Sequence, residues 1–224
     1  PDTREILKNL KGYYPESMPQ FPVKGVGPFE SPKTQGVSIS ILGTFVASAF
    51  SWGGMVMGMS IVSIILQQYG VALTMINIAV SLHVFGMFGL SIPFGWLTDR
   101  FGRRIVMALG GAILGLGAFI MPITSNYLII TLGVFLIGLG WSATNVASTA
   151  LLCDLTPGPR RGSILGANDV ATGATSVALP TLGGAILSSL GFFAFAIAGV
   201  LVSLPVILSV IPVHEPLRGK QSCP

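Results

Sequence analysis

Residues 95–104 read GWLTDRFGRR and form a short charged stretch between two long apolar segments. Gly95 and Gly102 bound the stretch, Asp99 supplies an acid, and three arginines make it basic. Glycine permits sharp turns and close approach of helices, whereas arginine favours the cytoplasmic side of a membrane. The stretch therefore predicts a tight cytoplasmic hairpin between two membrane-crossing helices.

The composition excludes an ordinary water-soluble domain. Hydrophobic residues make up 51% of the 224 residues and charged residues only 9%, whereas soluble domains carry about 25% charged residues. The basic residues gather in a few segments, which indicates membrane orientation and no nucleic-acid partner. Cys153 and Cys223 are expected as free thiols on the cytoplasmic side, without a disulfide framework.

Six apolar segments are each long enough to cross a bilayer, which takes about 20 residues per helix. We expect an all-α integral membrane protein with a six-helix transmembrane domain at residues 37–213. A cytoplasmic linker at 1–36, with a short amphipathic helix expected at 3–10, precedes it, and a cytoplasmic tail follows at 214–224. The expected spans are 38–66, 72–96, 105–123, 128–152, 163–189 and 192–212.

The lysines and arginines follow a one-sided pattern along these spans. All 12 lie in the linker, in the second and fourth loops, or in the tail, and the other three loops contain none. Alternate loops share a side of the membrane, and basic loops stay in the cytoplasm. Both termini are therefore expected in the cytoplasm, with the bilayer of the cell membrane as the surrounding partner.

Polar side chains inside the spans are costly against lipid, so we expect them to face a solute cavity or another helix. The third and sixth spans hold little beyond Ser and Thr, and the other four carry the polar groups. The cavity candidates are Ser51, Trp52, Met55, His83, Trp141, Asn145 and Ser148. Helix packing is expected at Gly54-xxx-Gly58, Gly111-xxx-Gly115 and Gly162-xxx-Gly166.

Two ionisable residues lie inside the predicted spans. Asp169 lies about 10 Å from the cytoplasmic end of its helix, at 1.5 Å per residue. We expect it to form a structural salt bridge or hydrogen bond, with Arg100 and Arg103 as the candidate partners, and a proton-carrying role is the alternative. His83 is expected to bond a neighbouring helix, with solute or proton handling as the alternative. The polar stretch 142–149 is equally compatible with lining a solute cavity and with packing against another helix.

The pattern G-x-L-x-D-R-x-G-R-R at 95–104 resembles the signature loop of the major facilitator superfamily of secondary transporters. Other stretches along nearly the whole chain are similar to the central linker and to helices seven, eight, ten and eleven of such transporters. These stretches are PDTREI at 1–6, MVMGM at 55–59, HVFGMF at 83–88, GLGWS at 138–142, LLCD at 151–154 and GAND at 166–169. The resemblance implies the carboxy-terminal half of a twelve-helix fold, helices seven to twelve, arranged as a 3+3 inverted repeat.

The resemblance also implies roles for the charged loop and for a missing half. In such transporters the loop is a conformational latch that packs against the opposite half and stabilises the state closed to the cytoplasm. The residues of this latch motif are Gly95, Asp99, Arg100, Gly102, Arg103 and Arg104. Asp99 would face a helix amino terminus of the amino-terminal six-helix half, which the same polypeptide or a partner subunit would supply. The alternative is a tight turn that only anchors the topology.

No nucleotide-binding loop, metal-ligand cluster or nucleophile with its base occurs in the sequence, so we expect no enzyme, cofactor or metal. The first hypothesis is a secondary active transporter of a small organic solute, with proton-coupled efflux as one form. A non-transporting membrane module that binds or senses a ligand, and a dimerising half-transporter, are the alternatives. The few charges in the spans favour neutral or lipophilic-cation solutes over polyanions.

The distribution of basic residues predicts the accessibility of engineered cysteines in intact cells. Positions 67, 125 and 189 should react with an impermeant thiol reagent from outside, and positions 103, 160 and 218 should not. External labelling at position 103 would reverse the proposed orientation.

Overall fold

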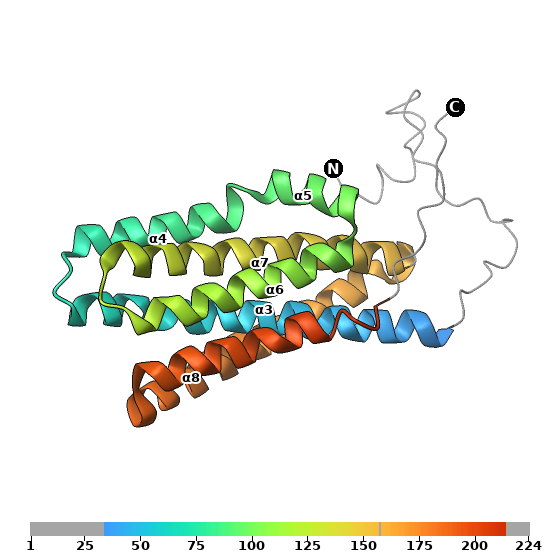
Figure 1. Ribbon diagram of the computed structural model, residues 1–224. Coiled ribbons are helices and arrows are strands. Elements are labelled where there is room, and N and C mark those ends of the chain that lie inside the picture. Colours follow the sequence, from blue (N-terminus) through green and yellow to red (C-terminus); the bar gives the residue numbers. More distant parts are fainter. Residues whose placement is uncertain (1–33, 157, 214–224) are drawn as a thin grey trace, which may run out of the picture. The chain divides into compact units, whose positions relative to one another are not determined.

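The computed structural model describes residues 34–156 and 158–213 (Figure 1). The predicted amphipathic helix at 3–10, most of the predicted linker, the predicted tail and Cys223 lie outside these residues. The described chain is helical, and its elements in order are α3 (Thr34–Gln68), α4 (Leu73–Phe88), α5 (Ser91–Phe101), α6 (Arg103–Ile120), the 3-10 helix η1 (Met121–Ile123), α7 (Tyr127–Leu155) and α8 (Gly158–Leu208).

Five stretches of the described chain are helical and apolar enough to cross a membrane. They are Ile39–Gln68, Leu73–Phe101, Arg103–Ile123, Tyr127–Leu155 and Arg160–Leu208. The fifth has 49 residues, which corresponds to about 73 Å of helix at 1.5 Å per residue. That length is more than twice the hydrocarbon core of about 30 Å, so this stretch does not cross the bilayer as one straight helix.

Gly191 interrupts α8 and divides it into two limbs. Its backbone has φ 81° and ψ −174°, a conformation that residues with a Cβ atom rarely adopt. In the first limb, Thr175 donates a hydrogen bond to Ala49 O, and Gly183 packs on Met57 further along α3. The second limb approaches α3 in the opposite direction, because Val202 lies beside Gly54 and Ser209 beside Gly43. The chain therefore doubles back at Gly191, and Figure 1 shows α8 turning back on itself.

The predicted span 72–96 is not one continuous helix, because α4 ends at Phe88 and α5 begins at Ser91. Pro93 supplies the physical reason. A proline has no N–H to donate to the carbonyl four residues earlier, and its ring clashes with that carbonyl, which here belongs to Gly89. The Ser91 hydroxyl donates to Met87 O at 3.3 Å, the acceptor that a continuous helix would give to the Ser91 N–H.

The predicted hairpin at 95–104 is also shorter than expected. Gly95 lies inside α5, which continues to Phe101, and α6 begins at Arg103. Gly102 alone makes the turn, with φ 101° and ψ 153°. The charged residues of this stretch are therefore held on two helix ends and not on a loop.

The centre of the bundle depends on close contact between α6 and α7. A Cβ atom on Gly110 would lie 2.7 Å from Gly140 O, and one on Gly117 would lie 2.5 Å from Gly133 O. The two helices are antiparallel, and each carries its glycines seven residues apart. Helix backbones in membranes approach this closely only where small residues line the contact.

The glycine spacings identified in the sequence have different surroundings. Gly111 packs on Val206 and Gly115 on Ser203, so this pair joins α6 to the second limb of α8. Gly54 packs on Val202 and Leu114, and Gly58 on Ile137. Gly162 and Gly166 have no atom within 4 Å of an added Cβ, so their face of α8 is open in the described part of the chain.

The contact between α6 and α7 predicts a position-specific effect of added methyl groups. Gly140→Ala would bring a Cβ against the backbone of Gly110 and Leu114, and overpacking of this kind costs about 1–3 kcal/mol. Gly184→Ala is the control, because nothing lies within 4 Å of its added Cβ. The free energy of unfolding, followed by far-UV circular dichroism in detergent, should fall only for Gly140→Ala; equal stability of the two variants would contradict the packing.

Candidate functional site

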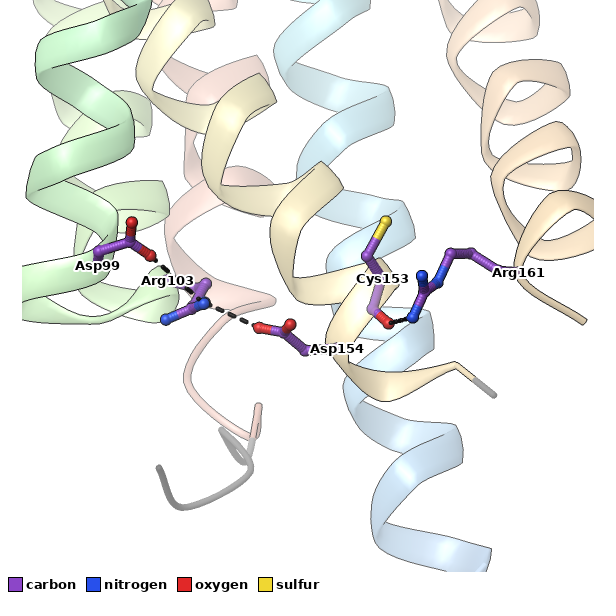
Figure 2. A network of polar contacts seen from close by, with 5 residues as sticks. All are labelled: Asp99, Arg103, Cys153, Asp154 and Arg161. Atoms are coloured by element: carbon purple, nitrogen blue, oxygen red, sulfur yellow. Dashed lines mark hydrogen bonds and ion pairs between the residues drawn. The ribbon is translucent and has the colours of Figure 1, made fainter. Parts of the chain in front are cut away.

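Arg103 joins three helices at one end of the bundle. It is the first residue of α6, and its guanidinium lies 3.5 Å from Asp99 Oδ1 of α5 and 3.0 Å from Asp154 Oδ2 of α7. The Arg103 side chain is 18% exposed, whereas Asp154 is 39% and Asp99 71% exposed. Figure 2 shows Arg103 between the two acids. We call these three residues the ion-pair cluster.

The helix dipoles oppose this arrangement of charges. Asp99 lies in the last turn of α5 and Arg103 in the first turn of α6, and each of these ends disfavours the charge it carries, by about 0.3–1 kcal/mol. An exposed ion pair contributes a similar amount, about 0.2–1 kcal/mol. The two unfavourable ends together are at least as large as this one favourable pair, so Asp99 alone does not stabilise the charge of Arg103. Asp154, which is less exposed than Asp99, supplies the second attraction.

Two more of the predicted latch residues, Arg100 and Arg104, lie beside the cluster. A neighbouring arginine bonds a carbonyl at the end of α7. Arg100 stacks over the Trp96 ring, with 5.2 Å from its guanidinium carbon to the ring centroid. Arg104 is exposed in the first turn of α6. On the other side, Arg161 of α8 donates to Cys153 O at 3.0 Å (Figure 2), where a cation suits the carboxyl end of the helix.

A second group of residues lies further along α7. The rings of Trp52 and Trp141 meet edge to face, with centroids 4.7 Å apart, and Phe88 meets Trp141 at 5.8 Å. Trp52 Nε1 donates to Asn145 Oδ1 at 3.2 Å. We call these four residues from α3, α4 and α7 the aromatic cluster. Three of them are among the predicted cavity candidates, and Phe88 is not.

The chemistry of the indole fixes the orientation of the Asn145 amide. An indole nitrogen is only a donor, so the amide atom that faces Trp52 is the oxygen, and the Nδ2 donors of Asn145 point elsewhere. Asn145 and Trp52 are half-buried, Trp141 is buried, and Phe88 is 62% exposed. The cluster therefore combines apolar ring surface with hydrogen-bond donors and carries no charge.

The remaining cavity candidates lie inside the bundle. Ser51, Met55, His83 and Ser148 are each at most 6% exposed. His83 Nδ1 lies 2.8 Å from Val134 O of α7, the interhelical bond that the sequence analysis expected. Ser148 donates to the carbonyl of Asn145 within its own helix, and Met55 belongs to the hydrophobic core.

The expected ion pair between Asp169 and Arg103 does not form, because Arg103 pairs with Asp99 and Asp154 instead. Asp169 lies on an exposed face of the first limb of α8, and its carboxylate makes no ion pair with Arg100 either within residues 34–156 and 158–213. Its neighbour Asn168 faces inward and accepts a hydrogen bond from Ser48 at 2.5 Å. The sequence places two adjacent polar residues here, and only one of them is used inside the bundle.

The less exposed pair of the ion-pair cluster, Arg103 and Asp154, should show a measurable interaction free energy. In a double-mutant cycle with Arg103→Gln and Asp154→Asn, we expect about 0.5–1 kcal/mol of favourable interaction in the free energy of unfolding. The more exposed Asp99→Asn, combined with Arg103→Gln, should give less, about 0.3 kcal/mol. A zero or unfavourable coupling between Arg103 and Asp154 would show that the contact does not stabilise the bundle.

Comparison with known proteins agrees with this architecture. The sequence pattern described as Major Facilitator Superfamily matches residues 41–222. The MFS-type transporter YddS of Bacillus subtilis is 31% identical over 156 residues, which cover 68% of this chain and 36% of that protein. The inner membrane transport protein YajR of Escherichia coli is 32% identical over 160 residues, 69% of this chain and 35% of that protein.

A shorter similarity extends to a mammalian protein. Solute carrier family 2, facilitated glucose transporter member 12 of Mus musculus is 30% identical over 94 residues, 42% of this chain and 15% of that protein. The chain spans about a third of the length of YddS and of YajR. The match over most of the chain, together with the helical membrane architecture, shows that this multi-pass membrane protein belongs to the Major Facilitator Superfamily, whose members are transporters and not enzymes.

Proposed function

We propose that the chain is the carboxy-terminal half, helices seven to twelve, of a secondary active transporter for a small organic solute. The bacterial relatives bear the names of transporters, and the chain spans about a third of their length. The single observation that carries the proposal is the match of the Major Facilitator Superfamily over residues 41–222. A solute site between two halves near the middle of the bilayer is what such a fold supports.

The two limbs of α8 support six crossings. They run in opposite directions along α3, as the contacts of Thr175 and Val202 indicate, and each limb counts as one span. An even number of spans, with every lysine and arginine on one side, gives cytoplasmic termini in a cell membrane. A 3+3 repeat is also supported, because the most apolar helix of each triplet, α6 and the second limb of α8, pack on each other at Gly111 and Gly115.

The exposed faces of α4, α5 and α8 support contact with a missing amino-terminal half. Only 28% of the most apolar window of Leu73–Phe101 and of Arg160–Leu208 is buried, against 61% for the windows in α3 and α7. The exposed face of α4 includes Asn77 and Ser81, and that of α8 includes Asp169. Polar groups at membrane depth are costly against lipid, so these faces suit a protein partner or a water-filled cavity.

The aromatic cluster supports a neutral or lipophilic-cation solute. Its rings offer flat apolar surface, and the Nδ2 group of Asn145 offers donors to a hydroxyl or carbonyl oxygen. Glucose, which the name of the mouse relative mentions, is one neutral solute of this kind. In the same proposal the ion-pair cluster acts as the latch, with the exposed Asp99 available to the opposite half.

The two alternative functions predict different behaviour of the assembled protein. A ligand-sensing module would bind solute without moving it, and a dimerising half-transporter would move solute as a pair of copies of this chain. Both lack one observation that the transporter proposal has, namely that the bacterial relatives matched over two thirds of this chain bear transport names.

Asp169 allows the coupling mechanism to be tested in proteoliposomes that contain the full-length protein. The probes are glucose, a neutral aromatic amide and an aromatic cation, and the readouts are solute exchange at equal pH and solute-dependent proton flux. Because Asp169 forms no ion pair in the described chain, Asp169→Asn should abolish proton flux and preserve exchange. Thr181→Val, an exposed polar residue on the same limb, is the control and should preserve both.

Two other outcomes would count against parts of this proposal. Loss of exchange together with proton flux in Asp169→Asn would assign a structural ion pair with the other half to this residue. Folded wild-type protein that binds a probe but moves none across the membrane would favour the sensor alternative.

A further inference from the structure

The helix α5 is separated from α4 and from α6 by a residue with non-helical backbone angles. At its beginning, Leu90 leaves the helical region with φ −107° and ψ 12°, directly after Gly89, which still has helical angles and donates to Phe85 O. Pro93 has no N–H to donate to the Gly89 carbonyl, so the helical hydrogen-bond ladder is interrupted here. At its end, Gly102 has φ 101° and ψ 153°. Because helices bend sharply only at such interruptions, the 11 residues of α5 can move as one rigid segment between two hinges.

The contacts of α5 with the bundle are few and lie along one stripe. Phe94 and Thr98 are its buried residues, one helical turn apart. Thr98 Oγ1 is buried and has no hydrogen-bond partner among the described residues. A buried hydroxyl without a partner is unfavourable and calls for an explanation. A movement of α5 that gives the Thr98 hydroxyl a partner, or exposes it to water, would remove this penalty. The unpaired hydroxyl therefore favours movement of α5 away from the observed position.

The beginning of α5 contacts α7 directly, and its end is linked to α7 through Arg103 of α6. At the beginning, Ser91 Oγ lies 3.4 Å from Ser142 Oγ, next to Trp141 of the aromatic cluster. At the end, Asp99 pairs with Arg103, which pairs with Asp154 of α7. Ser142 and Asp154 are 12 residues apart on one helix, which corresponds to about 18 Å at 1.5 Å per residue.

We propose that α5 is a hinged helix that couples the aromatic cluster to the ion-pair cluster, so that release of one end changes the contact at the other. Coupling needs an element with two arrangements that both sites bias, and the two backbone breaks supply one. In the proposed transporter this movement would link solute occupancy to the latch. The inference rests on the proposed function only in that last step.

The coupling is tested by disulfide formation in the full-length protein without any solute. Ser91→Cys and Ser142→Cys place two thiols at the near contact, in a background that includes Cys153→Ser and Cys223→Ser. The rate of crosslinking by copper phenanthroline is then compared with and without Asp154→Asn, which removes the α7 partner of Arg103 and so the link between the far end of α5 and α7. We expect the rate to fall at least threefold.

Two controls separate the hinged helix from general loosening of the bundle. Ser48→Cys with Asn168→Cys probes a contact between α3 and α8, and its crosslinking rate should not respond to Asp154→Asn. Pro93→Ala lets α4 and α5 join, so it should remove the effect of Asp154→Asn on the Ser91–Ser142 pair. If Pro93→Ala fails to fold, Asp99→Asn takes its place, and it should reproduce the effect because Asp99 belongs to α5.

Three results would overturn the proposal. The first is an unchanged crosslinking rate for the Ser91–Ser142 cysteine pair in Asp154→Asn. The second is an equal change in the crosslinking rate of the Ser48–Asn168 cysteine pair. The third is an effect of Asp154→Asn that persists in folded Pro93→Ala, because such an effect is transmitted through α7 and not through α5. None of these measurements requires transport. Failure of the coupling is therefore distinguishable from failure of the proposed function.

Discussion

A chain inside a bilayer must satisfy its backbone N–H and C=O groups internally, because lipid offers no hydrogen bonds. This constraint makes every described element helical and makes each interruption costly. The interruptions at Gly102 and Gly191 use φ values that glycine adopts readily, and the one before Ser91 is compensated by a hydroxyl that bonds a freed carbonyl. The positions of α5 and of both limbs of α8, and with α5 the ion-pair cluster, follow from these three interruptions.

The sequence predicted the membrane class, the approximate helices and the family, because apolar length and the distribution of arginine are properties that a single segment shows by itself. It also predicted the interhelical bond of His83, since a buried ring nitrogen at membrane depth needs a partner. The division of the span 72–96 was missed although Pro93 and Gly89 were visible. The long apolar run led to the prediction of one continuous helix. The missing N–H of Pro93 would have indicated an interruption four residues earlier.

The contacts within the candidate sites were harder to predict, because they depend on which helices become neighbours. Asp154 was visible next to Cys153, yet its pairing with Arg103 requires the antiparallel contact of α6 and α7 that the glycines at 110, 117, 133 and 140 allow. The same holds for Phe88 beside Trp141. The pairing of Asp169 with Arg103 was predicted wrongly, since Arg103 already has two acids within reach.

The placement of the aromatic residues gives the chain an optical property. Its sequence contains three tryptophans: two lie edge to face beside Asn145, and the third, Trp96, lies under the guanidinium of Arg100 on α5. The indole emission of the chain therefore arises entirely from the aromatic cluster and from the helix that joins it to the ion-pair cluster. A change in quantum yield or wavelength would report on those two regions and on no other part of this chain.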